Sequence, residues 1–395
     1  MKPGERKPTL RLFDYYFIEG ISSFAVTLLL FSVYFWTRER YQFTNVENLA
    51  IGAVLGASHI ISSRIGGRLG DRWGYNRLLL VGLAGVACVA LSAWIPDYRP
   101  MPFIAMGLYA AFIGITWPAL EAGAMHLPGK LNMPQRLGIY NLVWAISGTT
   151  GFFVSGFLFE LNPNTIFWIP GALHLFQIAW ILFQRNRHDI TGFTAMSFPH
   201  FGDHTSPEEK SLMVKMSWLT NSLGYFLAGG FAALTPHLGE RLGLSQSWTI
   251  WLGCSLLAAR AVGFTFFWRW DGWHYRRGWG HYALWSAPLY LAVIFFAQDI
   301  WLVALSCLLL GVSLSLSYYM SIYYSLDASD NKGEQGGLHE SIIGMGILMG
   351  PLTGAAGGWL TGTTFGAKST IIAGAFIIAA TGWAVILRSA SQKSK

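Results

Sequence analysis

Long apolar stretches alternate with short polar segments along the chain from Tyr15 to Leu387. The stretches have about the length that an α-helix needs to cross the ~30 Å hydrocarbon core of a bilayer. Charged residues gather between the stretches rather than within them. The pattern therefore predicts an all-α membrane protein with twelve transmembrane helices. The predicted spans are Tyr15–Trp36, Val46–Ile65, Leu78–Ile95, Met101–Leu127, Leu137–Leu158, Ile166–Phe183, Leu212–Leu234, Trp248–Trp268, His281–Phe296, Ile300–Leu326, Leu338–Leu360 and Ser369–Leu387.

A polar stretch in the middle of the chain separates the first six predicted spans from the last six. We therefore predict an N-terminal six-helix half over residues 1–184 and a C-terminal six-helix half over residues 211–395. Residues 185–210 form the predicted central loop between them.

Two segments repeat between the predicted halves. Residues 38–44 are similar to residues 239–245, at an offset of 201. The fifth predicted span is similar to the eleventh at an offset near 199, through Asn141, Gly148 and Gly151 in one and Glu340, Gly346 and Gly350 in the other. A duplicated six-span unit usually places its substrate site between the two copies, near the bilayer midplane.

The composition agrees with a chain that faces lipid. It is 53% hydrophobic and 12% charged, whereas an ordinary soluble domain is about 25% charged. The formal net charge is +7, but the basic residues follow the positive-inside rule and do not indicate nucleic-acid binding. A cytoplasmic N-terminus places 22 of the 27 Lys and Arg residues on the cytoplasmic side and leaves only Arg38, Arg40, Arg99, Arg241 and Lys368 outside. We expect a multi-pass protein of the inner (cytoplasmic) membrane with both termini in the cytoplasm.

The cysteine and histidine patterns indicate no disulfide framework and no bound metal. All three cysteines lie inside separate apolar stretches. Five possible metal ligands gather in the predicted central loop, but their spacing matches no standard zinc pattern. These five residues are His188, Asp189, His200, Asp203 and His204. We expect neither a metal nor another cofactor.

The segment between the second and third predicted spans reads GGRLGDRWGYNR over residues 66–77. It resembles the cytoplasmic loop signature of the major facilitator superfamily. The matching residues are Gly67, Asp71, Arg72, Gly74 and Arg77. The resemblance implies two six-helix halves that rock about a central cavity, with this segment as a gating motif that stabilises the inward-closed state.

Departures from the family's patterns limit the subclass. Tyr75 and Asn76 stand where the family often has basic residues, and the equivalent second-half segment over 269–277 is degenerate, so the latch is expected to be asymmetric. Drug and proton antiporters of the family commonly carry an arginine in span four and a glycine–proline pattern in span five. Residues 114–121 lack the arginine and residues 148–151 lack the proline, which counts against an antiporter.

Three acidic residues lie well inside predicted spans, namely Glu19, Glu121 and Glu340, and the last follows His339 directly. Charged residues at membrane depth generally face a cavity, pair with another group or hold a proton. All four residues are candidates for proton coupling. The structural alternatives are a paired acid for Glu19, pairing with His126 for Glu121, and stabilisation by a helix N-terminus for Glu340.

The tenth predicted span is rich in Ser and Tyr, which would be costly against lipid. Part of it is expected to face a cavity, where hydroxyls and aromatic rings would contact an organic solute. The cavity candidates are Trp117, Tyr140, Asn141, Trp144, Asn221, Tyr225, Tyr318, Tyr319 and Tyr323. Hydroxyl-mediated helix packing is the alternative for each of them. Arg64 and Arg260 are expected to snorkel or to latch the gate.

These patterns together predict a secondary active transporter for a small organic solute, coupled to protons or another ion. A facilitative uniporter and a multidrug/proton antiporter are alternatives within the same fold. A non-transporting membrane sensor is the alternative from a different class. An enzyme is not expected, because no nucleophile with a neighbouring base is visible. We expect a monomer, since one chain holds a complete pathway.

Overall fold

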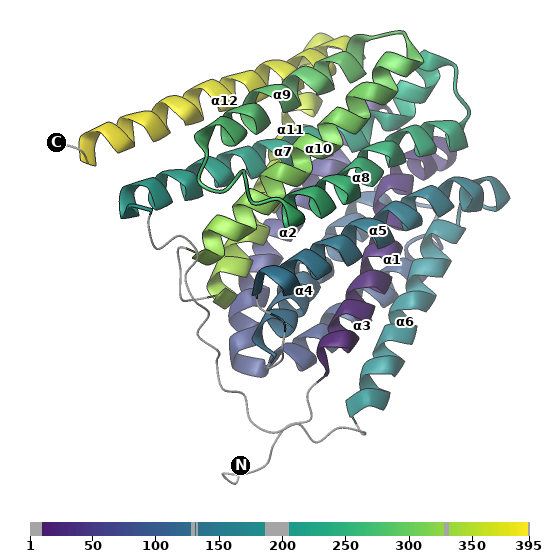
Figure 1. The fold of residues 1–395 in the computed structure, drawn as a ribbon. Helices are drawn as coiled ribbons and strands as arrows, with labels where there is room; N and C mark the ends of the chain where they lie inside the picture. The colour runs from purple at the N-terminus through teal and green to yellow at the C-terminus, as the bar shows by residue number, and fades with distance from the viewer. Residues whose placement is uncertain (1–9, 128–130, 132, 186–204, 328–331, 394–395) are drawn as a thin grey trace.

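The computed structural model describes residues 10–127, 131, 133–185, 205–327 and 332–393 (Figure 1). The described chain forms twelve α-helices: α1 (Leu12–Tyr41), α2 (Asn45–Trp73), α3 (Tyr75–Ser92), α4 (Met101–His126), α5 (Met133–Leu161), α6 (Thr165–Arg185), α7 (Pro207–Leu242), α8 (Gln246–Arg269), α9 (Arg277–Phe296), α10 (Ile300–Asp327), α11 (Lys332–Thr361) and α12 (Thr364–Lys393). His188, Asp189, His200, Asp203 and His204 of the predicted central loop lie outside the described residues.

Ten of these twelve helices are long and apolar enough to cross a membrane. The two others are α7, which carries many charged, Ser, Thr and Gly residues, and α9, which carries several Gly, Trp, Tyr and Pro residues. Several helices extend beyond the predicted spans. For example, α7 has 36 residues and begins at Pro207, because the Ser206 side chain accepts a hydrogen bond from the backbone N–H of Glu209 and caps a polar first turn.

The repeated segments adopt equivalent conformations at the ends of equivalent helices. The residues that cap the C-terminal ends of α1 and α7 are Gln42 and Gly243, and both are in the left-handed conformation, with φ values of 55° and 65°. The next helices begin after Thr44 and Ser245, whose side chains accept a hydrogen bond from the third helical residue. Each pair of residues is separated by the offset of 201 found in the sequence.

Helix packing repeats in the same way between α1–α6 and α7–α12. Helix α1 contacts α5 and α6, α2 contacts α4, and α3 contacts α4 and α6; the same contacts recur six helices later. In α5, Gly151 lies against the backbone of Phe24 in α1. In α11, Gly350 lies against the backbone of Phe226 in α7. A side chain at either glycine would separate the two helices.

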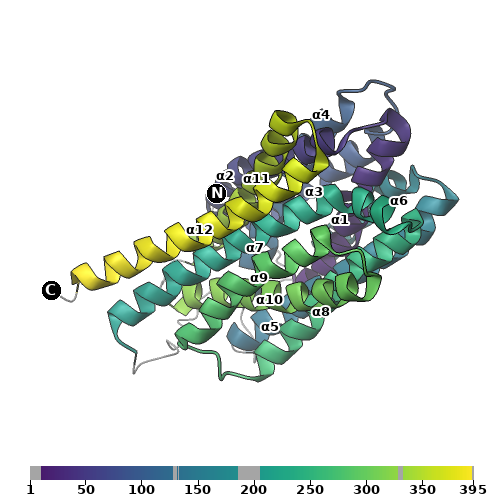
Figure 2. The same cartoon turned by 90° about the horizontal axis from the view of Figure 1, so that it is seen from above.

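The two groups of six helices meet mainly along two helix pairs, α2 with α11 and α5 with α8. Figure 2 shows α2 beside α11 and α5 near α8. The α2–α11 contact is a close approach of backbones: a Cβ atom at Gly56 would lie 2.2 Å from the backbone nitrogen of Leu348. One turn further along, Gly344 of α11 faces Ile60 of α2.

The bundle has two unlike ends. We call the end with the start of α1, the end of α6, the start of α7 and the end of α12 the terminal end, and the opposite end the far end. Figure 1 shows α6 and α12 converging toward the far end and diverging toward the terminal end. At the far end, an ion pair of 2.6 Å joins Arg38 of α1 to Glu240 of α7. Asn45 also donates a hydrogen bond of 2.9 Å to Thr364.

The predicted loop over residues 66–77 is mostly helical. Helix α2 continues through Trp73, α3 begins at Tyr75, and Gly74 alone separates them, with φ of +86°. A side chain would be strained at this φ, so glycine is required at the link. The polar residues just before Gly74 are compatible with a helix. The apolar pattern covers only the predicted span Val46–Ile65, so it does not show that the helix continues to Trp73.

We expect Gly56→Ala to lower the melting temperature of the purified protein, because the new Cβ would collide with the backbone of α11 rather than with a movable side chain. Overpacking of this kind costs about 1–3 kcal/mol. Thermal unfolding in detergent, followed by tryptophan fluorescence, measures the loss.

The matched control is Gly278→Ala, where a Cβ would meet nothing within 4 Å. Equal melting temperatures for the two variants would contradict the close packing of α2 on α11.

Candidate functional site

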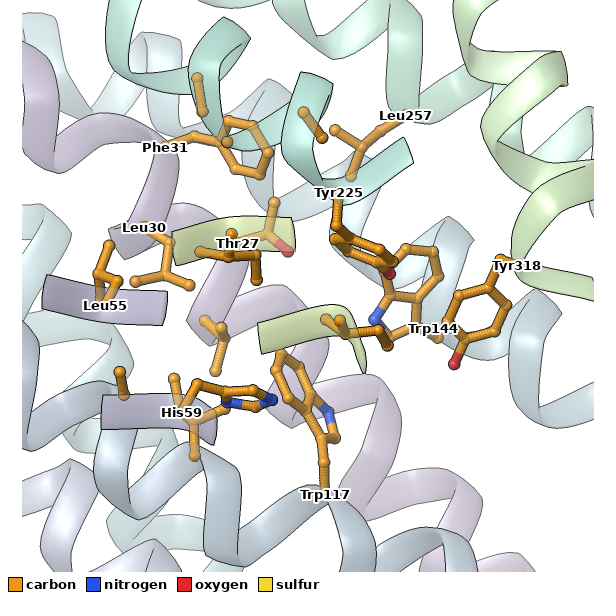
Figure 3. Close-up of a pocket in the computed structure, with 18 of the residues that line it drawn as sticks. Thr27, Leu30, Phe31, Leu55, His59, Trp117, Trp144, Tyr225, Leu257 and Tyr318 are labelled. Carbon is orange, nitrogen blue, oxygen red and sulfur yellow. The ribbon is translucent and has the colours of Figure 1, made fainter. Parts of the chain in front are cut away.

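A cavity of about 180 Å³ lies at the centre of the bundle and is lined by both groups of helices (Figure 3). Toward the far end its wall is mostly apolar and includes Leu30, Phe31 and Leu257, together with Tyr34. Charged side chains, a histidine and hydroxyl groups also line it. They are Thr27, Tyr34, His59, Glu121, Tyr140, Tyr225, Arg260, Tyr318 and Glu340. A mostly apolar cavity with a few convergent polar groups is the usual form of a small-molecule site.

A buried histidine–carboxylate pair joins the two groups of helices at this cavity. The Nε2 atom of His59 on α2 lies 2.9 Å from Oε2 of Glu340 on α11. Each residue is only 4% exposed. Figure 3 shows His59 beside Trp117, with ring centroids 6.1 Å apart. A buried charge needs such a partner, because its desolvation is otherwise uncompensated.

Glu19 lies behind the cavity wall rather than on it. Its carboxylate accepts hydrogen bonds from Ser23 Oγ at 2.6 Å and from the Tyr140 hydroxyl at 2.8 Å, and the residue is fully buried. Tyr140 itself lines the cavity. The Tyr140 hydroxyl therefore connects this carboxylate to the site.

The other proton-coupling candidates have separate positions. Glu121 of α4 lines the cavity directly and interacts electrostatically with Glu19 and Glu340. The side chain of His126, its expected partner, lies outside the described residues. His339 is buried behind Tyr318, and its Nδ1 atom lies 3.1 Å from Ser321 Oγ.

Arg260 of α8 lies in the cavity wall, among aromatic rings, and is 6% exposed. The expectation that it snorkels or latches a gate is wrong for this residue, because its side chain is buried and lines the central cavity. Arg64, by contrast, is exposed. The rings of Trp144, Tyr225 and Tyr318 lie together on one side of the cavity in Figure 3.

The aromatic and amide candidates divide into three sets. Trp117, Tyr140, Trp144, Tyr225 and Tyr318 line the cavity. Asn141 and Asn221 are buried outside the lining, and within the described chain their amide nitrogens have no hydrogen-bond partner.

Tyr319 and Tyr323 lie elsewhere, packed on Trp273 near the terminal end of α10. Their Ser- and Tyr-rich helix has more than one polar face, and sequence alone did not distinguish which face meets the cavity.

The sequence analysis missed His59 and did not expect Arg260 at the cavity, and both positions follow from the repeat. His59 and Arg260 are separated by 201 positions, and so are Trp117 and Tyr318. In the first group His59 lies against Trp117, and in the second the guanidinium carbon of Arg260 lies 5.8 Å from the Tyr318 ring centroid. Applying the offset to the polar residues inside the spans would have identified both positions.

The gating-motif residues lie at the terminal end. Arg72 and Arg77 are exposed, and the side chain of Asp71 lies outside the described residues. Asn76, one of the departures from the family pattern, accepts a hydrogen bond of 2.7 Å from the Tyr15 hydroxyl. This bond ties the start of α3 to α1.

The family model of the Major Facilitator Superfamily matches residues 13–351. The chain belongs to this superfamily. It is therefore a multi-pass membrane transporter of small solutes and not an enzyme. No curated protein matches the chain in sequence.

Solved transporters share the fold. The nucleoside transporter NupG matches with a TM-score of 0.67 and 12% identity, over 95% of this chain and 99% of NupG. A mutant of NupG matches with a TM-score of 0.70 and 12% identity, over 94% and 99% of the two chains. The human organic anion transporter MFSD10 (TETRAN) matches with a TM-score of 0.60 and 15% identity, over 96% and 100%. At these identities the likeness shows the fold alone.

We expect the single substitutions His59→Leu and Glu340→Leu each to lower the melting temperature more than the double substitution does. Each single change leaves one buried polar partner uncompensated, which costs about 3–5 kcal/mol for a buried pair. Thermal unfolding of all three variants gives the coupling between the two sites.

Glu39→Leu serves as the control for loss of an exposed carboxylate. Strictly additive losses at positions 59 and 340 would show that the two side chains do not stabilise each other.

Proposed function

We propose that the protein is a proton-coupled secondary transporter that moves a small organic solute across the inner (cytoplasmic) membrane by alternating access. The observation that carries this proposal is the His59–Glu340 pair, which is buried, lines the cavity and joins opposite groups of helices. Both side chains can gain or lose a proton. No other pair of titratable groups in the described residues has all three properties.

The pair links proton binding to the relative position of the two groups of helices. The attraction between an imidazole and a carboxylate depends on which of them carries the proton. A proton gained or lost at this contact therefore changes the free energy that holds α2 against α11. A ligand that binds two states unequally shifts the equilibrium between them, and here a proton is that ligand.

Glu121 and Glu19 are further proton sites in this proposal. Glu121 faces the cavity and interacts electrostatically with Glu340, so a proton on one changes the charge that the other experiences. Glu19 reaches the cavity through the Tyr140 hydroxyl. His339 has a supporting role in this proposal, since it contacts Ser321 and packs against the Tyr318 ring.

The positions of the basic residues and of the Arg38–Glu240 contact indicate which side of the membrane each end of the bundle faces. Most Lys and Arg residues of the described chain lie toward the terminal end, which favours a cytoplasmic location for that end. The Arg38–Glu240 contact then closes the outer side, and the diverging terminal ends face the cytoplasm. In the opposite state, Gly67, Asp71, Arg72, Gly74 and Arg77 would latch the cytoplasmic side. One chain holds the whole cavity, which is consistent with a monomer.

Proteoliposomes with a pH-sensitive dye inside test the coupling. We expect solute-dependent acidification with the wild-type protein when solute pools are screened. Glu340→Gln should abolish this proton movement yet retain exchange of labelled solute against unlabelled solute, since exchange needs no net proton transfer. Glu121→Gln and Glu19→Gln then show which other acid contributes.

Glu39→Gln, an exposed change, should behave as wild type. Solute flux without proton movement in the wild type would indicate a facilitative uniporter. A protein that moves none of the pools would instead favour a sensor.

The Arg38–Glu240 pair should bias the protein toward closure at the far end. In a background without native cysteines, a Thr27→Cys reporter in the cavity wall is labelled with a membrane-impermeant thiol reagent from each side. Arg38→Gln and Glu240→Gln should each raise labelling from the far end by up to about fivefold, because a partly exposed ion pair contributes at most about 1 kcal/mol.

The exchanged pair, Arg38→Glu with Glu240→Arg, should restore low labelling. Arg40→Gln is the control, since Arg40 lies at the same end but contacts Asp97 within its own group of helices. An equal increase in that control would mean that charge at the far end, and not this contact, controls access.

A further inference from the structure

The proton-coupling proposal leaves one cavity charge unused, the guanidinium of Arg260. In the described residues no carboxylate lies within ion-pair distance of it. Its Nη2 atom donates a long hydrogen bond of 3.4 Å to the Tyr225 hydroxyl, and its Nε atom has no partner among the described residues. The side chain is nevertheless 94% removed from solvent, with 6% exposed.

Arg260 therefore has fewer hydrogen-bond partners than a buried guanidinium needs. A guanidinium carries five N–H donors and keeps its positive charge at any physiological pH. Burial of an unpaired charge in a membrane protein is costly, and such residues are retained where a substrate or ion pathway needs them. One long hydrogen bond meets only a small part of that cost.

Four aromatic rings surround the guanidinium carbon of Arg260. The ring centroids of Trp144, Tyr225, Phe264 and Tyr318 lie 4.6, 5.5, 5.7 and 5.8 Å from it. Cation–π contacts of this kind help to keep the charge in place. They do not satisfy the N–H donors, because a ring face is only a weak acceptor.

We propose that the transported solute is an organic anion, a carboxylate carried on one flat apolar ring. Its oxygens accept the N–H groups of Arg260 as a bidentate pair. Its ring lies against Trp144 and Tyr318, whose own rings stack with an interplanar angle of 6°. This inference rests on the proposed transport function and names its substrate class.

The cavity fits one ring. Its volume of about 180 Å³ is close to the roughly 150 Å³ of an apolar protein cavity that accommodates benzene. The apolar wall toward the far end, with Leu30, Phe31 and Leu257, receives the part of the solute that lies away from Arg260.

The acidic residues of the cavity are compatible with an anion. Glu340 contacts His59 at 2.9 Å, and in Figure 3 His59 lies away from the Trp144–Tyr225–Tyr318 side. Glu121 faces the cavity and would repel a carboxylate when ionised, whereas a proton removes that repulsion. Arg260 cannot lose its charge in the same way. Uptake of a proton together with the anion therefore has an electrostatic reason.

Ligand binding to the purified protein in detergent tests the inference without a gradient. The probes are benzoate, phenylacetate and cinnamate, each compared with its neutral amide, together with benzylamine as a cation. Quenching of tryptophan fluorescence and the ligand-induced rise in melting temperature report binding. We expect at least one acid to bind tenfold or more tightly than its amide, with no binding of benzylamine.

Arg260→Gln should remove the preference for the acid, and Arg260→Lys should weaken binding of the acid while keeping the preference. Arg269→Gln, an exposed arginine on the same helix, should leave both unchanged. The wild-type acid-to-amide ratio and the lysine variant keep the test decisive if the glutamine variant fails to fold.

Three results would overturn the inference: equal binding of acid and amide, preferential binding of benzylamine, or no binding of any of the acids by the wild type. Failure of the transport proposal looks different. Selective binding of an acid with no flux in proteoliposomes would reject transport and leave the anion site in place. Flux of a neutral or cationic solute without binding of the acids would reject the anion site and leave the transport proposal in place.

Discussion

The close approach of α2 to α11 is the contact on which the site depends. Gly56 allows the two backbones to meet at Leu348, and Gly344 admits Ile60 one turn further along. His59 and Glu340 lie on this same stretch, so their 2.9 Å contact exists only because the helices are this close. In lipid, helices gain little from apolar contact alone, and small residues at the interface let dispersion and hydrogen bonds hold them together.

The internal repeat preserves the arrangement of the backbone, whereas the side chains at the cavity differ between the two groups of helices. Equivalent caps, equivalent glycine contacts and equivalent helix pairs recur in the two groups of six helices. At the cavity, however, the equivalent positions carry His59 in one group and Arg260 in the other. One can exchange a proton and the other keeps its charge. A symmetric scaffold thus gives the cavity two unlike walls, one with an imidazole paired to a carboxylate and one with a guanidinium among aromatic rings.

Sequence reasoning predicted the fold well because each of its signals is local. Apolar length gave the helices, and the segment over residues 66–77 gave the family. It was weaker for the site, since helices that are apolar on every face carry no periodic signal of which side meets the cavity. Tyr318 and Tyr319 are neighbours in sequence, yet only Tyr318 lines the cavity. Arg260 looked like a residue near a helix end, and only the path of α8 shows that it points inward.

Helix α2 runs without interruption from Asn45 to Trp73 and carries His59 near its middle. Arg72 follows thirteen residues later, about 20 Å along the helix axis. The segment that resembles a gating motif is largely the last part of the same helix that carries His59, and Gly74 alone connects this helix to α3. His59 and Arg72 therefore belong to one continuous helix. A small tilt of α2 at its contact with α11 would displace the basic residues at the C-terminal end of α2 by a larger distance.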